Sequence, residues 1–364
     1  MAIDRRSLLA GLVVTAGIGP RAARAAEVEL FAAARKGRDG RFAAAIFDDA
    51  GQDVRVVDLP ERGHDVTVSP VSRTCVVFAR RPGNFALAFS PELSRPPVAF
   101  TTPTDRHFYG HGVFSRDGRL LYATENDFEA GRGVIGVYDA TGGFNRIGEM
   151  PTYGVGPHDI ALMGRQSILV VANGGLREHP DFGEGRRVLN PGEIATSLAY
   201  IDARTGGLLE RHDLGLPGTL SLRHLDLARD GTVILGAQVE GSSAAHPLVF
   251  RHRRQQPLQR IGLPDDAAAA LCGYVSSVAV DRGGEIAAVS SSRGAIVLMI
   301  EVTSGRVAGR VMLKDVSGIA PAGADGCFVV TSGTGVVAGT GARGDTLSER
   351  ALLPVAWDNH AVRL

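Results

Sequence analysis

Half of the ten histidines occupy one repeated position in this sequence. Each of the five stands at the start of a short apolar segment, and the first three are 47 residues apart: His64, His111, His158, His224 and His360. Neutral imidazole is a common protein ligand for iron, copper and zinc. If the repeat arranges these segments around one axis, the five imidazoles converge there. We therefore predict a transition-metal site, with His111, His158 and His224 as its candidate ligands.

The segments that must position these histidines belong to an internal repeat of short strands. In one copy, the apolar stretch His111–Phe114 leads through the turn Arg116–Arg119 into a second apolar stretch, Leu120–Ala123. Similar units recur at spacings of roughly 45 residues, which is typical of propeller blades. The 47 Gly and 18 Pro supply the turns, and no convincing amphipathic helix interrupts the pattern. A fold of alternating strands and helices is therefore disfavoured.

The two ends of the chain complete the repeat. His360–Val362 resembles the start of an innermost strand with nothing after it, whereas residues 28–59 offer three strands with no innermost strand before them. Joining the two ends forms a further blade and leaves no exposed sheet edge. We predict one all-β domain, a seven-bladed β-propeller over residues 26–364, whose ring is closed by N- and C-terminal strands. An eight-bladed ring, or six blades with a separate N-terminal hairpin, is the alternative.

Polar residues that follow the second strand of several copies form another group of candidates. The loop after a second strand returns to the end of the channel where the first strand began, so these residues should share a face with the histidines. The binding candidates in this group are Glu125, Asn126, Asp127, Asn173, Gln238, Glu240 and Arg293. Each of these polar groups taken alone is common in a turn between strands. Their expected position on one face of the propeller is what makes them candidates for binding.

A structural role for the repeated histidines remains an alternative at this point. A histidine at this position of a blade can hydrogen-bond the backbone of the neighbouring blade instead of a ligand. Around His224 the apolar alternation is shifted by one residue, which would let that side chain face elsewhere. The distances between the five imidazoles decide between the two interpretations.

The first 25 residues are predicted to be a twin-arginine signal peptide. Arg5 and Arg6 precede the apolar run Leu8–Ile18, and Ala23–Ala25 offers the small residues of a cleavage site. This run is shorter than the ~20 residues that span a bilayer. We therefore expect a periplasmic protein exported by the twin-arginine route, with no membrane span in the mature chain.

Composition and missing motifs exclude several classes of function. The 39 basic and 39 acidic residues balance, which argues against a nucleic-acid partner. Three widely spaced cysteines without a Cys-x-x-Cys pair indicate neither a thiolate metal site nor a disulfide framework. Gly-x-Ser-x-Gly, His-Glu-x-x-His and a glycine-rich phosphate loop before a helix are also absent, so classical serine hydrolase and kinase chemistry are disfavoured.

Several segments resemble one protein family. They are Tyr109–Ser115, Tyr122–Asp127, Gly131–Asp139, Gly156–Ile160, Val171–Gly175 and Ser221–Leu225. In these segments the chain resembles the domain of unknown function 1513 family of exported proteins. The resemblance implies a propeller of the YVTN or quinoprotein amine dehydrogenase-like type. It also implies frequent encoding beside imelysin-like iron-uptake proteins and a di-haem oxidoreductase, which are therefore the expected partners. The family has no established catalytic residues.

Two classes of function follow from these observations. The first is a periplasmic, non-enzymatic component of iron acquisition that binds iron or another transition metal, or docks partner proteins. The alternative is an enzyme that uses the central channel, either a redox partner with a bound cofactor or a lactonase-like metal hydrolase. In the hydrolase, Glu125, Asn126, Asn173 and Glu240 would hold the metal. A pure scaffold whose polar face contacts another protein is a third interpretation.

Overall fold

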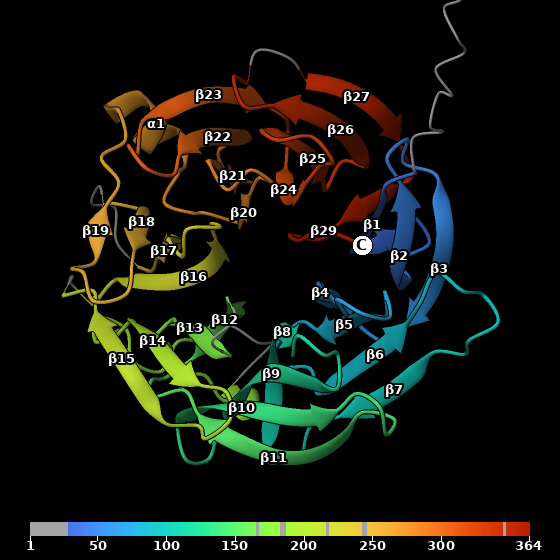
Figure 1. The fold of residues 1–364 in the computed structure, drawn as a ribbon, viewed down its shortest axis with the longest axis vertical. Coiled ribbons are helices and arrows are strands. Elements are labelled where there is room, and N and C mark those ends of the chain that lie inside the picture. Colours follow the sequence, from blue (N-terminus) through green and yellow to red (C-terminus); the bar gives the residue numbers. More distant parts are fainter. Residues whose placement is uncertain (1–27, 165–166, 183–186, 216–217, 242–245, 345–346) are drawn as a thin grey trace, which may run out of the picture.

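The computed structural model describes residues 28–364 except 165–166, 183–186, 216–217, 242–245 and 345–346. In this part of the chain, seven antiparallel sheets stand around a central axis like the blades of a propeller (Figure 1). The predicted all-β, seven-bladed propeller is therefore confirmed. The signal segment predicted at residues 1–25 lies outside the described residues.

Blades 1 to 3 follow one another along the chain, and each begins with its innermost strand. Blade 1 contains β4 (Gly63–Val68), β5 (Cys75–Ala79), β6 (Phe85–Phe89) and β7 (Val98–Thr101). Blade 2 contains β8 (Arg106–Phe114), β9 (Leu120–Asp127), β10 (Arg132–Asp139) and β11 (Asn145–Pro151). Blade 3 contains β12 (Pro157–Met163), β13 (Ile168–Asn173), β14 (Ser197–Asp202) and β15 (Leu208–Asp213), with the short 3-10 helix Pro180–Phe182 between β13 and β14.

Blades 4 to 6 repeat this arrangement. Blade 4 contains β16 (Leu220–Leu227), β17 (Val233–Val239), β18 (Val249–His252) and β19 (Gln259–Arg260). Helix α1 (Asp265–Ala270) leads to blade 5, which contains β20 (Ser277–Val280), β21 (Ile286–Ser291), β22 (Ile296–Glu301) and β23 (Val307–Met312). Blade 6 contains β24 (Val316–Pro321), β25 (Cys327–Ser332), β26 (Val336–Gly341) and β27 (Leu347–Leu352).

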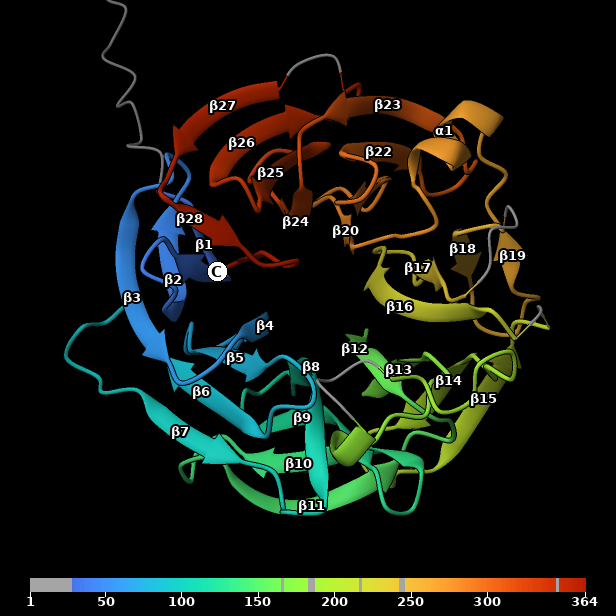
Figure 2. The same ribbon diagram turned by 180° about the vertical axis from the view of Figure 1, so that it is seen from behind.

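The closing blade is built from both ends of the chain. Its outer three strands are β1 (Leu30–Gly37), β2 (Phe42–Asp48) and β3 (Asp53–Leu59), and its innermost strand is divided into β28 (Val355–Trp357) and β29 (Val362–Arg363). Both C-terminal pieces pair antiparallel with β1, and β28 lies beside β1 when the ring is seen from behind (Figure 2). The predicted closure by N- and C-terminal strands is confirmed, which excludes the eight-bladed and six-bladed alternatives.

Burial follows from the position of each strand within its blade. β13 is a second strand and is buried along its whole length, because its sheet packs between two neighbouring sheets. β11 is outermost and alternates exposed with half-buried residues, which is the period of a strand with one solvated face. Apolar side chains of blades 3, 4 and 5 form one continuous core cluster. The strands that border the channel are thus held on a rigid apolar scaffold.

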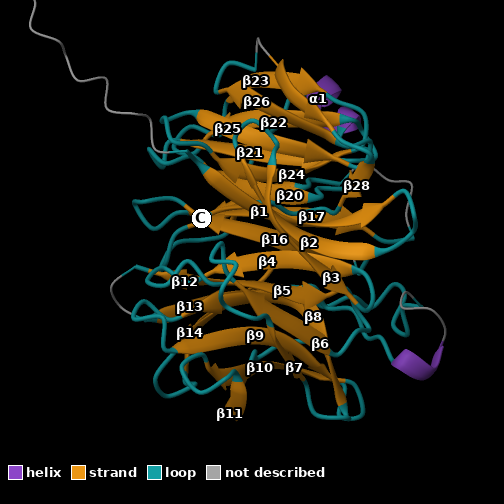
Figure 3. Ribbon diagram, turned by 90° about the vertical axis from the view of Figure 1, so that its right-hand side faces the viewer, coloured by secondary structure: helices purple, strands orange, loops and turns teal. Residues whose placement is uncertain are grey.

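Helical structure in the described residues is confined to short segments at one side of the disc. Figure 3 shows α1 and the 3-10 helix Pro180–Phe182 on that side, with the C-terminus at the opposite side. No helix of the described residues is long and apolar enough to cross a membrane.

The closing blade offers a direct test of its contribution to stability. Trp357 of β28 is 4% exposed, and its ring lies 4.7 Å from that of Phe47 and 5.2 Å from the guanidinium carbon of Arg35. Replacing a buried aromatic side chain by alanine costs about 3–5 kcal/mol. We expect Trp357→Ala to lower the free energy of unfolding by that amount in urea denaturation followed by circular dichroism. Leu93→Ala is the control, because Leu93 is 75% exposed; an equal loss in both variants would contradict the prediction.

Candidate metal centre

The repeated histidines reach the channel from irregular positions in the innermost strands. The pairing register shifts between Gly63 and Val66 in β4, Phe108 and Gly112 in β8, Pro157 and Asp159 in β12, and Leu222 and His224 in β16. A β-bulge of this kind bends a strand and redirects a side chain. In β16 the extra residue is Arg223, directly before His224. It compensates for the one-residue shift in the apolar alternation of the sequence, so the side chain of His224 faces the other histidines.

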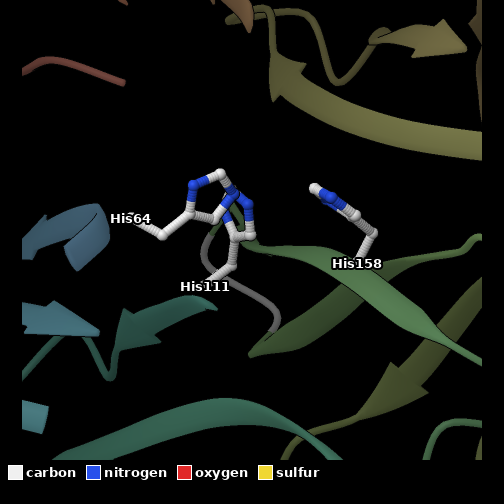
Figure 4. A group of neighbouring side chains, drawn as sticks. All are labelled: His64, His111 and His158. Atoms are coloured by element: carbon white, nitrogen blue, oxygen red, sulfur yellow. The ribbon is translucent and has the colours of Figure 1, made fainter. Parts of the chain in front are cut away.

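The five imidazoles converge on one point of the channel. His111 is central: its ring centroid lies 5.0 Å from that of His64, 4.9 Å from His158, 5.6 Å from His224 and 4.8 Å from His360. All five side chains are buried. Figure 4 shows three of the rings turned toward one another. We call these five residues the histidine cluster.

Two overlapping sets of three within the histidine cluster have the spacing of a metal site. In His64, His111 and His158, one ligand atom from each residue lies within 4.8 Å of the others, and the same holds for His111, His224 and His360. His111 belongs to both sets. An ion between three imidazoles requires nitrogens about 2.0–2.1 Å from the metal. Modest side-chain rotation would close either set around one ion.

Carboxylates on the outer side of the cluster orient two of the rings. His111 donates from Nδ1 toward Asp65 at 3.2 Å and toward Asp159 at 3.3 Å. Nδ1 of His64 forms a hydrogen bond with Oδ1 of Asp358, at a distance of 3.3 Å. A carboxylate on one ring nitrogen fixes the tautomer and leaves the other nitrogen as a more basic ligand. These pairs are the usual outer support of a metal-binding histidine.

Four ring nitrogens of the cluster are buried without a hydrogen-bond partner. They are Nε2 of His111, Nδ1 of His158, Nδ1 of His224 and Nε2 of His360. A buried polar atom that makes no hydrogen bond costs about 1–3 kcal/mol, and such atoms are rare in native proteins. A cation that accepts their lone pairs would satisfy all four nitrogens. The residues present therefore fit a metal ion.

The backbone hydrogen bonds suggested for the histidines are made by aspartates instead, while His111 contacts its neighbouring blades through Asp65 and Asp159. Asp159 Oδ2 accepts a hydrogen bond from the backbone N–H of Leu225 in the next blade at 3.0 Å. Asp226 Oδ2 accepts one from the N–H of Val280 at 2.7 Å, again in the next blade. The carboxylates thus connect neighbouring innermost strands. The imidazoles remain available for a ligand.

Burial keeps the imidazoles neutral. Desolvation lowers the pKa of every cluster histidine, to about 4 for His360 and well below the ordinary value for His64, His158 and His224, where neighbouring imidazoles add to the effect. Desolvation also raises the pKa of the carboxyls of three nearby aspartates to about 6: Asp65, Asp159 and Asp226. Neutral imidazoles bind a cation without first losing a proton.

The histidine cluster borders two cavities whose other charged residues differ, and Arg363 is the one arginine on the aspartate side. The aspartate cavity, of about 330 Å³, is bordered by His111, His224 and His360 together with the three aspartates. The arginine cavity, of about 20 Å³, is bordered by His64, His158 and His224 together with Arg80, Arg81 and Arg223. A cation in the cluster would therefore have carboxylates on one side and guanidinium groups on the other.

Glu125 and Asp127 line neither of these cavities. Glu125 accepts hydrogen bonds from the hydroxyl of Tyr138 at 2.6 Å and from Arg146 at 2.9 Å, both on outer strands of blade 2. Asp127 accepts one from Arg132 at 2.8 Å. The structure places both carboxylates in ion pairs within blade 2.

Asn126 and Asn173 are likewise absent from the walls of the two channel cavities. Asn126 donates from its side-chain amide to Nε2 of His107 at 3.0 Å. Asn173 donates to the carbonyl oxygen of Thr152 at 3.0 Å. The first bond joins two strands of blade 2 and the second joins β13 to the residue that follows β11, so neither amide contacts the histidine cluster through these bonds.

Gln238, Glu240 and Arg293 lie at or beside the arginine cavity. Gln238 borders it directly. Glu240 holds the guanidinium of Arg223 at 2.8 Å, and the guanidinium carbon of Arg293 lies 4.9 Å from the ring centroid of Tyr274. Arg223 and Tyr274 both border this cavity. Gln238 therefore lines the cavity, and Glu240 and Arg293 contact residues that line it.

The carboxylates that orient the rings were not among the sequence candidates. Asp65 and Asp159 directly follow a cluster histidine in the sequence, and Asp358 stands two residues before His360. The recurring His-Asp dipeptide was the available signal. No signal pointed to Tyr109, whose hydroxyl is buried at the arginine cavity without a hydrogen-bond partner.

A glycine makes room for the ring of His64. Gly110 has a φ of +103°, and a Cβ added there would lie 2.5 Å from Cδ2 of His64. Both the backbone conformation and the close approach require glycine. The residue before His111 thus lets the two rings pack together.

Comparison with known proteins gives a family and a fold. A family model described as "Protein of unknown function (DUF1513)" matches residues 57–364. A chain in the crystal structure of a mitotic checkpoint complex is similar in structure, with a TM-score of 0.60 and 13% sequence identity, over 85% of this chain and 87% of that chain. At this identity the likeness concerns the fold alone. No curated protein matches the chain.

The buried titratable groups predict how stability depends on pH. Between pH 6 and 5, unfolding lets five cluster histidines take up protons, whereas three aspartates protonated in the folded state release theirs. Burial also lowers the pKa of His107, to about 4, and that of His252. Proton uptake by the histidines therefore outweighs proton release by the aspartates, and the free energy of unfolding should fall as the pH decreases over this range. Urea unfolding of metal-free protein at several pH values measures this slope.

A matched pair of variants assigns that slope to the cluster. His158→Asn removes one histidine that unfolding protonates, so its slope should be shallower. Leu93→Ala changes an exposed residue and keeps every titratable group, so it should keep the slope of the unmodified protein. Stability that stays constant or rises as the pH falls would contradict the assignment.

Proposed function

The chain belongs to the family described as protein of unknown function (DUF1513), and we propose that it binds a transition-metal ion in the central channel of its propeller. The observation that carries this proposal is the group of four unpaired, buried ring nitrogens in the histidine cluster. His111 would be the central ligand, because it belongs to both sets of three imidazoles. Asp65 and Asp159 would keep its Nδ1 protonated and its Nε2 directed at the ion.

Iron is the physiological metal that we propose. Imidazole nitrogens suit Fe(II), Cu(II) and Zn(II), and affinity in solution rises toward copper whichever metal a protein carries in the cell. The choice of iron therefore rests on the resemblance to exported proteins encoded beside iron-uptake components. The carboxylates of the aspartate cavity support the approach of a cation from that side.

We propose a carrier or docking role in the periplasm and not an enzyme. A metal enclosed by several imidazoles, with the rings buried, suits retention of the ion more than turnover of an organic substrate. The groups suggested for a lactonase-like site do not support that alternative, since Glu125, Asn126 and Asn173 border neither channel cavity. Export by the twin-arginine route, with imelysin-like and di-haem proteins as partners, completes the proposal.

Metal titration tests the central claim. Purified protein is titrated with Fe(II) under anaerobic conditions, and separately with Cu(II) and Zn(II), in a calorimeter, followed by dialysis and metal analysis. We expect retained metal at one ion per histidine cluster. Removal of a supporting group typically lowers metal affinity 10–100-fold, so His111→Ala, which removes a ligand, should lower it by about 100-fold or more.

His246→Ala is the matched control for this titration. His246 lies outside the cluster, with its Nε2 3.4 Å from Oγ1 of Thr219, and it is also outside the separate group Glu210, His212 and His252, whose ligand atoms lie close enough to hold an ion. Its removal should therefore leave the affinity unchanged. Circular dichroism of each variant checks that the propeller is intact. The proposal fails if the unmodified protein retains no metal, or if folded His111→Ala binds as tightly as the control.

A further inference from the structure

We infer that the arginine cavity receives a single anionic oxygen, which the bound metal ion would share with Arg223 and Tyr109. The ligand class is a small oxygen donor, either hydroxide or the leading oxygen of a small carboxylate or carbonate. This inference rests on the proposed metal-binding function and specifies the other ligand of the same centre. It concerns the side of the cluster that faces away from the aspartates.

The wall of the arginine cavity is built for negative charge. Three guanidinium groups, from Arg80, Arg81 and Arg223, stand beside two tyrosines, an asparagine and a glutamine. No carboxylate of the described residues borders this cavity, whereas three border the aspartate cavity across the cluster. Guanidinium groups are strong donors to oxyanions. Each of these guanidinium groups is also paired with a carboxylate, Arg80 with Asp358, Arg81 with Glu178 and Arg223 with Glu240. The cavity therefore offers an anion oriented donors, whereas the aspartates across the cluster offer it acceptors only.

Two buried donors at the cavity have no partner. The hydroxyl of Tyr109 and Nε of Arg223 make no hydrogen bond, although Tyr109 is 1% and Arg223 2% exposed. Leaving such donors unpaired is costly, and the cost is highest for a charged group. Both residues border the cavity, and a ligand oxygen is the acceptor that we propose for their donors. The same oxygen would lie beside His158 and His224, which border the cavity as well.

The guanidinium groups are anchored from outside the cavity. Arg223 pairs with Glu240 at 2.8 Å, and Arg81 pairs with Glu178 at 2.9 Å. Neither glutamate borders the cavity. The glutamates therefore hold the donors in place without filling the space in front of them. Preorganised donors of this kind bind an anion without first losing side-chain freedom.

The size of the cavity limits the occupant. Its volume is about 20 Å³, and a space of about 10–15 Å³ already accepts one water-sized atom. A single oxygen fits, and a whole phosphate does not. The histidine cluster is on the inner side of this space, so an oxygen held there is within reach of a metal ion in the cluster. Any remainder of the anion would have to extend away from the ion.

Azide binding to the Cu(II)-loaded protein tests the inference. Azide is a small anion whose terminal nitrogen takes the place of the oxygen, and its charge-transfer band reports ligation to Cu(II). We expect saturable azide binding in the unmodified protein. Arg223→Gln should raise the azide Kd by about tenfold or more, and Tyr109→Phe by a smaller factor, because each removes one donor to a charged ligand.

Arg363→Gln is the matched control, because Arg363 borders the aspartate cavity and its removal changes the charge by the same amount. It should leave the azide Kd within about twofold, since screened charges across the cluster matter less than direct donors. Tyr109→Phe keeps the test valid if Arg223→Gln does not fold. Displacement of azide by formate at constant pH identifies a carboxylate ligand, and displacement only at raised pH identifies hydroxide.

The metal and anion measurements separate the two claims. If neither Cu(II) nor Fe(II) binds, both the proposed metal-binding function and the inference about the anion are contradicted. If metal binds but azide does not, or if the azide Kd is the same in Arg223→Gln, Tyr109→Phe and Arg363→Gln, only the inference is overturned.

Discussion

The pairing between the two ends of the chain is the constraint on which the rest of the structure depends. β28 and β29 supply the innermost strand of the blade whose other strands come from the N-terminal segment. This pairing closes the ring and thereby fixes how far apart the innermost strands stand. It also brings His360 to 4.7 Å from His64, ring centroid to ring centroid, and delivers Asp358 to the Nδ1 of His64. The same segment therefore closes the ring of blades and brings His360 and Asp358 to the histidine cluster.

The channel concentrates groups that an ordinary protein core would reject. The cavities on the two sides of the histidine cluster are bordered by five imidazoles, three aspartates and four arginines, with Arg363 on the aspartate side. Burial makes the imidazoles neutral and raises the pKa of the three aspartates to about 6. The glutamates that pair with Arg81 and Arg223 border neither cavity. The other three arginines stand on one side of the neutral imidazoles, and the three aspartates stand on the other.

The sequence was sufficient for the blades and only partly for the site. Alternation and Asp-Gly turns predict strands because burial in a propeller repeats with the chain, and the half-blades at both ends predict closure. The position of His224 could not be read in this way. Its bulge depends on how β16 pairs with β17, and pairing register is a property of two strands together. Glu125 misled for the same reason, since a residue at the end of a second strand can face the blade interior, where Tyr138 and Arg146 meet it.

The divided innermost strand of the closing blade has a consequence for when the centre can form during synthesis. Asp358 and His360 are synthesised after blades 1 to 6, whereas β1, with which their strand pairs, is synthesised before them. A nascent chain can assemble blades 1 to 6 and still lack one imidazole and the carboxylate that orients another. The completed channel would therefore exist only after residue 360 has been synthesised and its strand has paired with β1. Any ligand that needs all five imidazoles would then bind only to a molecule whose ring has closed.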